Sequence, residues 1–150
     1  MENPINNTVF DTRDLIAYRE HLQEELLDLW KSYFEGTDME QEVEDHTFED
    51  IDFNLEGFRD RSDFDEMYDH YNNIDTFCAE LSGSPDYQWG EGVIHEYYFT
   101  DYCKELLEDV GYIPKDMPSW IEIDFEKTAE NMKVDYTEII YDSESYYVRA

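Results

Sequence analysis

Residues 11–36 read DTRDLIAYREHLQEELLDLWKSYFEG, and this stretch carries the clearest periodic pattern of the chain. Its apolar side chains recur every three or four residues and would form one stripe along a helix: Leu15, Tyr18, Leu22, Leu26, Leu29 and Tyr33. Asp11 or Thr12 can cap the start of this helix, and Gly36 suits its end. The pattern predicts an amphipathic helix from about residue 11 to residue 35.

The middle of the chain carries weaker patterns. Alternation of apolar and polar residues over 51–55 predicts a short strand with one wet face. Ser62 followed by Asp65 resembles a capping box and predicts the start of a second helix. The Asn72-Asn73 pair could break that helix, and the apolar residues after it could instead extend it.

The last third combines helices with a hairpin. Helical spacing predicts one helix from about residue 97 to 110, ended by Gly111, and a short helix capped by Asp124. Alternating residues over 136–148, with a turn at 142–144, predict a β-hairpin. The expected fold class is α+β: a helix-rich acidic domain with a short C-terminal β-hairpin.

These patterns divide the chain into three regions. Residues 1–10 are expected to form a flexible polar arm, residues 11–85 an acidic helical region and residues 86–150 an α/β region. The last two regions are expected to form one compact unit, because 150 residues suffice for one domain.

The charge of the chain is extreme. Forty Asp and Glu face ten Lys and Arg, which gives a formal net charge of −30. Direct binding to DNA, RNA or an anionic membrane requires a basic face, so those ligands are excluded. Aromatic residues make up 17% of the chain, which argues against disorder.

Location and thiol chemistry follow from what the sequence contains. The first residues lack the basic and apolar parts of a signal peptide, and no apolar run approaches the roughly 20 residues of a membrane span. We therefore expect a cytoplasmic protein. Cys78 and Cys103 form no CxxC pair; two thiols are favoured, and one disulfide stays open.

Motifs of enzymes and metal sites are incomplete. His95-Glu96 begins like HExxH, but Phe99 occupies the position of the second histidine. Asp50, Asp52 and Asn54 match the first positions of an EF-hand loop, which then fails at its glycine and its final glutamate. We expect no enzyme activity, no cofactor and no bound metal.

The charge itself is the best functional candidate. A compact chain of this length is about 38 Å across, and a duplex of that length carries about 22 phosphates. Thirty net charges match or exceed that density, which suggests imitation of DNA, with general acidity as the plain alternative. Residues 38–80 hold 16 of the acids against two Arg, and the expected phosphate-like residues lie there: Glu40, Glu42, Glu44, Asp45, Glu49, Asp50, Asp52, Asp60, Asp63, Asp65, Glu66 and Asp69.

Residues 112–132 read YIPKDMPSWIEIDFEKTAENM, and a Tyr-rich hairpin follows that ends in Tyr147-Val148-Arg149. By these two features, residues 90–150 resemble ArdA-type antirestriction proteins. Pro114, Trp120 and Ile121 of this stretch are expected to form the fold rather than a contact. The family resemblance implies an acidic, often dimeric protein of a phage or mobile element that occupies the DNA-binding groove of type I restriction-modification enzymes.

The leading expectation is a DNA-mimic inhibitor of a host defence enzyme. Its partner would be a DNA-binding host protein, with no direct nucleic-acid or membrane contact and with a possible homodimer. A second hypothesis is a phage adapter that binds a host polymerase or regulator through aromatic anchors. A third is an acidic enzyme or metal binder.

Overall fold

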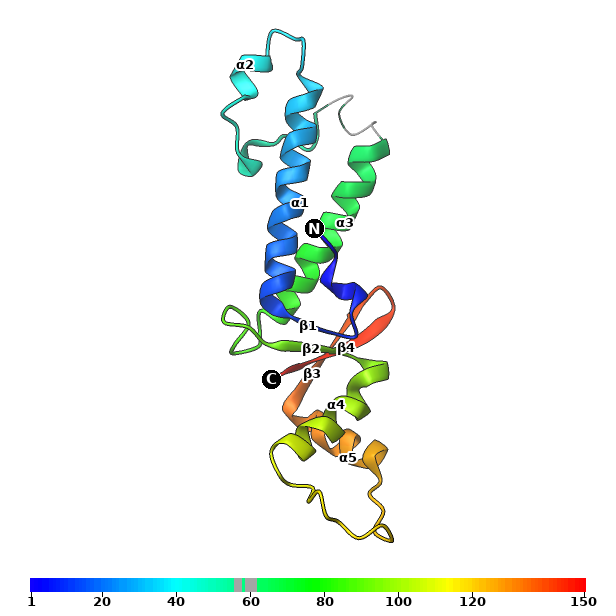
Figure 1. Cartoon of the computed structure of the whole chain (residues 1–150). Coiled ribbons are helices and arrows are strands. Elements are labelled where there is room, and N and C mark those ends of the chain that lie inside the picture. The colour runs from blue at the N-terminus through cyan, green and yellow to red at the C-terminus, as the bar shows by residue number, and fades with distance from the viewer. Residues whose placement is uncertain (56–57, 59–61) are drawn as a thin grey trace. The chain divides into compact units, whose positions relative to one another are not determined.

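A computed structural model describes residues 1–55, 58 and 62–150 of the chain (Figure 1). Of the described residues, 53% are helical, and four strands among them form one antiparallel sheet. The expected α+β class with a C-terminal hairpin is therefore confirmed. The chain divides into two compact units: unit 1 comprises residues 1–2 and 16–76, and unit 2 comprises residues 3–15 and 77–150.

Two antiparallel helices form the frame of unit 1 (Figure 1). They are the parts that unit 1 contains of α1 (Thr12–Tyr33) and α3 (Ser62–Leu81). The Tyr18 hydroxyl lies 2.8 Å from Nε2 of His70, and the Gln23 amide donates to the Tyr71 hydroxyl at 3.1 Å. Helix α1 confirms the element expected over residues 11–35.

The two helices enclose a core rich in aromatic rings. The ring of Phe58 lies 5.2 Å from that of Trp30 and 4.1 Å from that of Phe64, measured between centroids. Phe53 stacks on Tyr68 at 4.6 Å. Aromatic side chains bury large areas, and they provide the hydrophobic stabilisation that a strongly charged unit needs.

The segment between the helices contains α2 (Glu40–Val43) and the short 3-10 helix η2 (Phe48–Asp50). The strand expected over residues 51–55 is wrong, because this segment forms turns. The Asp52 carboxylate accepts from the backbone N–H of Asn54 at 3.0 Å, which favours a turn over an extended strand. Ile51 and Phe53 turn inward, without any neighbouring strand to pair with among the described residues.

Helix α3 runs through the predicted break. Asn72 and Asn73 both lie on its exposed face, while Tyr71 and Ile74 are buried. Burial of the apolar face outweighs the low helix propensity of two exposed Asn residues. The helix therefore continues to Leu81, as the extension hypothesis required.

Unit 2 is built on the four-stranded sheet. Its strands are β1 (Val9–Asp11), β2 (Gly92–His95), β3 (Tyr136–Tyr141) and β4 (Glu144–Arg149), in the order β1-β2-β4-β3. The predicted hairpin is confirmed as β3 and β4. Asp142 and Ser143 both have positive φ, 50° and 65°, as the common two-residue hairpin turn requires.

The first ten residues are not one free arm. Pro4–Asn6 forms a 3-10 helix, η1, and β1 pairs with β2 in the register Val9 to Ile94. Pro4 and Phe10 are buried. Three residues were too few for a strand pattern to stand out in the sequence.

Two helices lie between β2 and β3 in the chain: α4 (Glu96–Asp109) and α5 (Phe125–Met132). The 3-10 helix η3 (Lys133–Asp135) follows them. Asp124 caps α5 as predicted, accepting from the N–H of Lys127 at 3.0 Å. Cys78 and Cys103 are both buried thiols, not joined in a disulfide. Burial raises the pKa of the Cys103 thiol, which keeps it protonated and unreactive.

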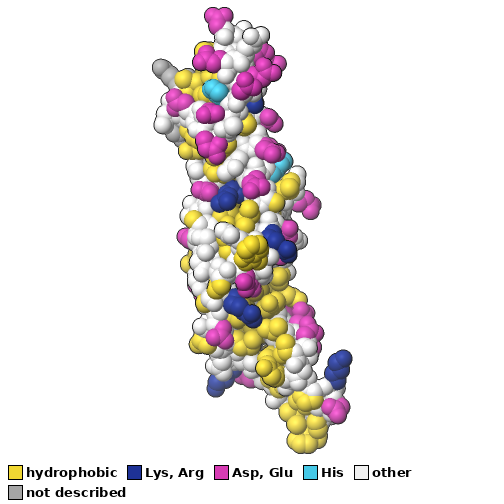
Figure 2. Space-filling model, turned by 90° about the vertical axis from the view of Figure 1, so that its left-hand side faces the viewer, with side chains coloured by type: hydrophobic (Ala, Val, Ile, Leu, Met, Phe, Trp, Pro, Cys, Tyr) yellow, Lys and Arg dark blue, Asp and Glu magenta, His cyan; other side chains and the backbone are white. Residues whose placement is uncertain are grey.

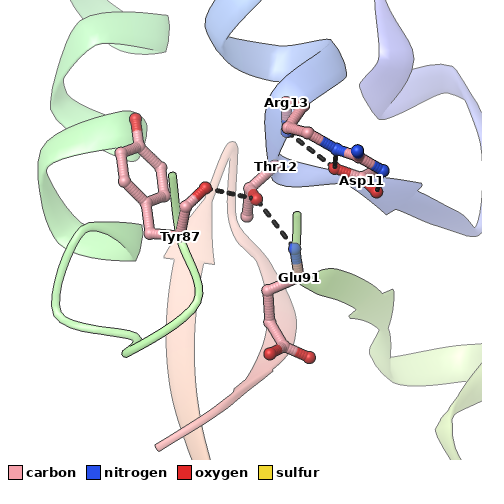
Figure 3. Close-up of polar contacts among 5 residues, drawn as sticks. All are labelled: Asp11, Thr12, Arg13, Tyr87 and Glu91. Atoms are coloured by element: carbon pink, nitrogen blue, oxygen red, sulfur yellow. Dashed lines mark hydrogen bonds and ion pairs between the residues drawn. The ribbon is translucent and has the colours of Figure 1, made fainter. Parts of the chain in front are cut away.

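A buried threonine joins the start of α1 to the loop before β2 (Figure 3). The Thr12 hydroxyl donates to the carbonyl of Tyr87 at 2.7 Å and accepts from the N–H of Glu91 at 2.9 Å. Arg13 forms an ion pair with Asp11 at 2.8 Å beside it. The two bonds of the Thr12 hydroxyl satisfy the carbonyl of Tyr87 and the N–H of Glu91, which are not paired within the sheet.

Candidate protein-binding surface

The acids predicted to imitate phosphates lie in unit 1. Asp60 lies outside the described residues; the other eleven are all exposed. We call these eleven the acidic surface: Glu40, Glu42, Glu44, Asp45, Glu49, Asp50, Asp52, Asp63, Asp65, Glu66 and Asp69. Figure 2 shows acidic side chains scattered over the face of unit 1 that it presents.

Sparse apolar residues hold this surface in place. In α2 the side chain of Val43 is buried, with 1% of its surface exposed, and the acids around it face solvent. Ile51 and Phe64 are buried in the same way after η2 and at the start of α3. Each short element therefore anchors one apolar side chain in the core and presents its carboxylates to solvent.

Several carboxylates of the acidic surface are oriented by backbone hydrogen bonds. Glu40 accepts from the N–H of Gly36 at 3.2 Å. Asp50 and Thr47 form a capping box on η2, with a bond of 2.8 Å from the Thr47 N–H. That backbone bond, and then the Thr47 hydroxyl, lowers the pKa of Asp50. Asp50 therefore keeps its charge to lower pH than an ordinary aspartate.

The acids at the start of α3 have two roles. Asp63 and Asp65 lie in the first turn, where negative charge is favourable to the helix dipole. Asp63 also accepts from the N–H of Phe64 at 3.0 Å. The side chains of Glu66 and Asp69 make no hydrogen bond or ion pair with any residue that the structure describes.

The sequence prediction missed a row of acids on α1. Glu20, Glu24 and Asp28 are exposed and follow one another at intervals of four residues, about 6 Å along the helix. None of the three side chains has a hydrogen bond or ion pair to the described part of the chain. We call them the α1 row. Their spacing is visible in the sequence, but acids are denser in residues 38–80, which drew the prediction there.

Basic side chains compensate little of this charge. Residues 16–76 hold 20 Asp and Glu and only four Lys and Arg. In unit 1, Arg19 forms an ion pair with Asp75, at 3.4 Å, and Nε2 of His21 lies 2.9 Å from Oε1 of Glu25. Neither contact uses an acid of the α1 row.

The charge of unit 1 can be compared with that of DNA. A compact unit of 61 residues has a radius of gyration of about 10 Å, which corresponds to a sphere about 27 Å across. A duplex of that length carries about 16 phosphates. Residues 16–76 have a net charge of −16, so this unit alone reaches the charge of an equal length of duplex.

The histidines serve packing and capping. The Trp30 indole N–H donates to Nδ1 of His46 at 3.3 Å, and His95 caps α4 by accepting from the N–H of Tyr97 at 3.2 Å. Within the described ranges, no group of three His, Cys, Asp or Glu is arranged to hold a metal ion. Searched over the same residues, no helix is long and apolar enough to cross a membrane.

Three residues of the stretch that carries the family resemblance lie outside the core. Trp120 has 81% of its surface exposed, and Pro114 and Ile121 are also exposed. The expectation that these three form the fold is wrong. Ile113 and Met117 are half-buried in the same loop, so they supply its packing instead.

Comparison of the chain with protein-family models, with curated proteins and with solved structures finds no match. The resemblance of residues 90–150 to ArdA-type antirestriction proteins therefore stays a prediction, based on the residues quoted above.

Proposed function

We propose that the chain is a DNA-mimic inhibitor that occupies the DNA-binding cleft of a host defence enzyme, a type I restriction-modification enzyme or a similar nuclease. One observation carries the proposal: unit 1 exposes a dense set of carboxylates, since residues 16–76 hold 20 Asp and Glu against four Lys and Arg. The chain acts by binding and needs no catalytic residue or cofactor. Its place of action would be the host cytoplasm.

The mechanism is electrostatic. Carboxylates take the positions of phosphates against Lys and Arg of the cleft, and bound ions are released. The field of unit 1 also steers the encounter and raises the association rate at low salt. Since many weak contacts share the binding energy, no single acid is essential.

The magnitudes show why more than one row is needed. The α1 row places one charge about every 6 Å, whereas one DNA strand carries one about every 3.4 Å of axis. A single helix row therefore has little more than half the linear charge of one strand. The acidic surface of α2, η2 and α3 supplies the rest.

Two other readings predict different behaviour. General acidity predicts no specific partner. An adapter that binds through aromatic anchors predicts binding that persists in salt and leaves DNA binding intact. Trp89 and Tyr97, with 76% and 82% of their surfaces exposed, are the kind of residue that the adapter would use.

The test is competition on a purified type I restriction-modification enzyme. We expect the chain to displace duplex DNA, and its dissociation constant to rise at least about tenfold between about 50 and 200 mM salt. Neutralising the α1 row and then groups of the acidic surface should weaken binding step by step. Binding without displacement of DNA, or without salt dependence, would contradict the proposal.

A matched control uses acids of unit 2. Asp101, Glu122 and Asp135 are exposed, and their replacement by the corresponding amides removes the same charge as neutralising the α1 row. We expect a clearly smaller loss of affinity from this control than from the α1 row. Equal losses would mean that net charge alone, not its placement on unit 1, determines binding.

A further inference from the structure

We propose that the outer edge of β3 is a docking site for an extended, basic segment of another protein, which adds a strand to the sheet of unit 2. This docking goes beyond the DNA-mimic function. It depends on the backbone and charge of one strand, and it holds or fails whatever the target of unit 1.

The first observation is the hydrogen bonding of β3. This strand lies at the end of the sheet order β1-β2-β4-β3, and Tyr141 pairs with Glu144 across a two-residue turn. In such a hairpin every second residue bonds to the partner strand, so the odd-numbered residues of β3 bond to β4. The carbonyl of Asp135 continues this alternation, since it accepts from the Ala150 N–H at 3.0 Å.

The even-numbered residues therefore direct their backbone groups away from β4. The N–H and C=O groups of Glu138 and Ile140 have no hydrogen-bond partner among the described residues. Tyr136 differs, because its N–H already bonds to the carbonyl of Lys133. Glu138 and Ile140 thus each offer a donor and an acceptor, which is the pattern that an added strand pairs with.

The second observation is that this edge is open. β3 has six residues in continuous register with β4, and its sequence YTEIIY contains no Pro or Lys, two residues that protect natural edge strands. Thr137, Glu138 and Ile140 are exposed. Ile140 has 63% of its surface exposed, and Val134, just before the strand, has 82%. The edge therefore presents both apolar surface and backbone groups to a partner.

Charge complementarity identifies the occupant. Residues 134–142 hold three exposed acids, Asp135, Glu138 and Asp142, and no Lys or Arg. A second copy of the chain would place like charges opposite one another, which destabilises a strand pair, and two chains of −30 repel each other. A strand that carries Lys or Arg is attracted instead.

One face of β3 fits such a basic strand. Successive side chains of a strand alternate between its faces, so Glu138 and Ile140 share one face. The Tyr147 hydroxyl donates to the Glu138 carboxylate at 3.0 Å and orients it. A Lys or Arg of the added strand therefore meets an oriented carboxylate, while its aliphatic stem covers Ile140.

The test uses a defined probe: a seven-residue peptide with blocked ends in which lysine and valine alternate. It is titrated into the isolated chain at about 300 mM salt, where general attraction between the peptide and the acids is screened. Amide hydrogen exchange is read residue by residue. Saturating peptide should slow exchange at Glu138 and Ile140 by about tenfold or more. Exchange at Thr137 and Ile139, whose amides bond to β4, should change by less than about twofold.

Two variants separate backbone pairing from charge. Ile140→Pro removes an outward N–H and no bond to β4, and edge strands accept proline. It should weaken peptide binding about tenfold or more. Ile140→Thr, the matched control, keeps the N–H and a branched side chain, and it should bind within about threefold of wild type.

A modified peptide provides the converse control. The same lysine–valine peptide, methylated at its backbone nitrogens, keeps its charge but donates no backbone hydrogen bond. It should bind wild type as weakly as the unmodified peptide binds Ile140→Pro. Should Ile140→Pro fold poorly by circular dichroism, the methylated peptide and the exchange pattern of wild type decide the question.

The outcomes are clear-cut. Binding that survives either Ile140→Pro or methylation of the peptide overturns the proposal, because charge alone then holds the peptide. No binding, or slowed exchange elsewhere but not at Glu138 and Ile140, overturns it as well. Self-association of wild type that Ile140→Pro abolishes would make a second copy the occupant and would also overturn it.

Discussion

Removing the charges of the α1 row should make the protein more stable and a weaker inhibitor at the same time. The variant is Glu20→Gln, Glu24→Gln and Asp28→Asn. The row contains two like-charge pairs four residues apart, and each such pair destabilises a helix by about 0.2–0.5 kcal/mol. Relief of both pairs should raise the free energy of unfolding by about 0.4–1 kcal/mol.

The assay is urea unfolding of the isolated chain, read from the midpoint and its slope. At low salt the midpoint of the variant should exceed that of wild type. At about 1 M salt the screening length falls to about 3 Å, shorter than the spacing of the row, and the difference should disappear. The same variant should compete less well with duplex DNA and show a shallower salt dependence.

The matched control is Glu25→Gln on the same helix. Oε1 of Glu25 lies 2.9 Å from Nε2 of His21 at the surface, so neutralising Glu25 should leave stability unchanged or lower it by up to about 1 kcal/mol. A triple variant that is destabilised by more than about 1 kcal/mol would refute the view that the row costs stability and is available for binding. A gain that persists in high salt would show that repulsion is not its cause.

Other predictions concern unit 2. Thr12→Val should lower the free energy of unfolding by about 1–3 kcal/mol in urea, because two buried backbone groups lose their partner, and Thr12→Ser should recover most of it. Gly90→Ala should cost more than about 1 kcal/mol, since φ is +112° and the new Cβ would lie 2.5 Å from Nε of Arg13. Adding Arg13→Ala relieves the clash but not the backbone strain at position 90, so only part of the lost free energy of unfolding should return. Its full return would show that backbone strain contributes nothing. Burial, with help from nearby carboxylates, raises the pKa of Tyr146 from 10.0 to about 12. The fold therefore favours the neutral phenol, whose contribution to the free energy of unfolding is complete below pH 10 and is lost as the pH rises toward 12. The free energy lost would be about 2.7 kcal/mol without screening and about 1–2 kcal/mol with screening by solvent. Tyr146→Phe should flatten this part of the unfolding profile, measured beside tyrosinate absorbance, and an unchanged profile would contradict the assignment.

Periodicity predicted the long elements well. In α1 and α4 an apolar stripe, a capping residue and a terminal glycine agree with one another, so local and tertiary preferences select the same structure. The hairpin was visible for the same reason, since its alternation and its turn residues are consistent. Asp124 at the start of α5 shows that a cap alone can locate the beginning of a short helix.

Short segments were predicted less well because packing determines them. Ile51 and Phe53 alternate with polar residues as in a strand, yet both side chains pack in the aromatic core of unit 1. Among the described residues no neighbouring strand is present to pair with them. Val9–Asp11 is a strand only because Gly92–His95 lies beside it. Such pairing is non-local, and a window of sequence does not contain it.

The candidate site was located in part. Counting acids identified the segment that carries the acidic surface, because charge this dense has to lie at the surface. It overlooked the α1 row, which depends on spacing along a helix. Trp120, which was expected to form the fold rather than a contact, is exposed. Composition thus predicts where charge is exposed but not which rings are left outside.

The register of β1 has a consequence for synthesis. Val9 pairs with Ile94, 85 residues later in the chain, so the edge strand leaves the ribosome long before its neighbour exists. Residues 16–76 can collapse on their aromatic core during that interval, whereas the sheet must wait until β2 and β4 have emerged. The entropy of closing such a long loop grows only logarithmically with its length. The acidic segment could therefore be lengthened or shortened at little cost to the sheet, which leaves its size free to match the cleft of the proposed partner.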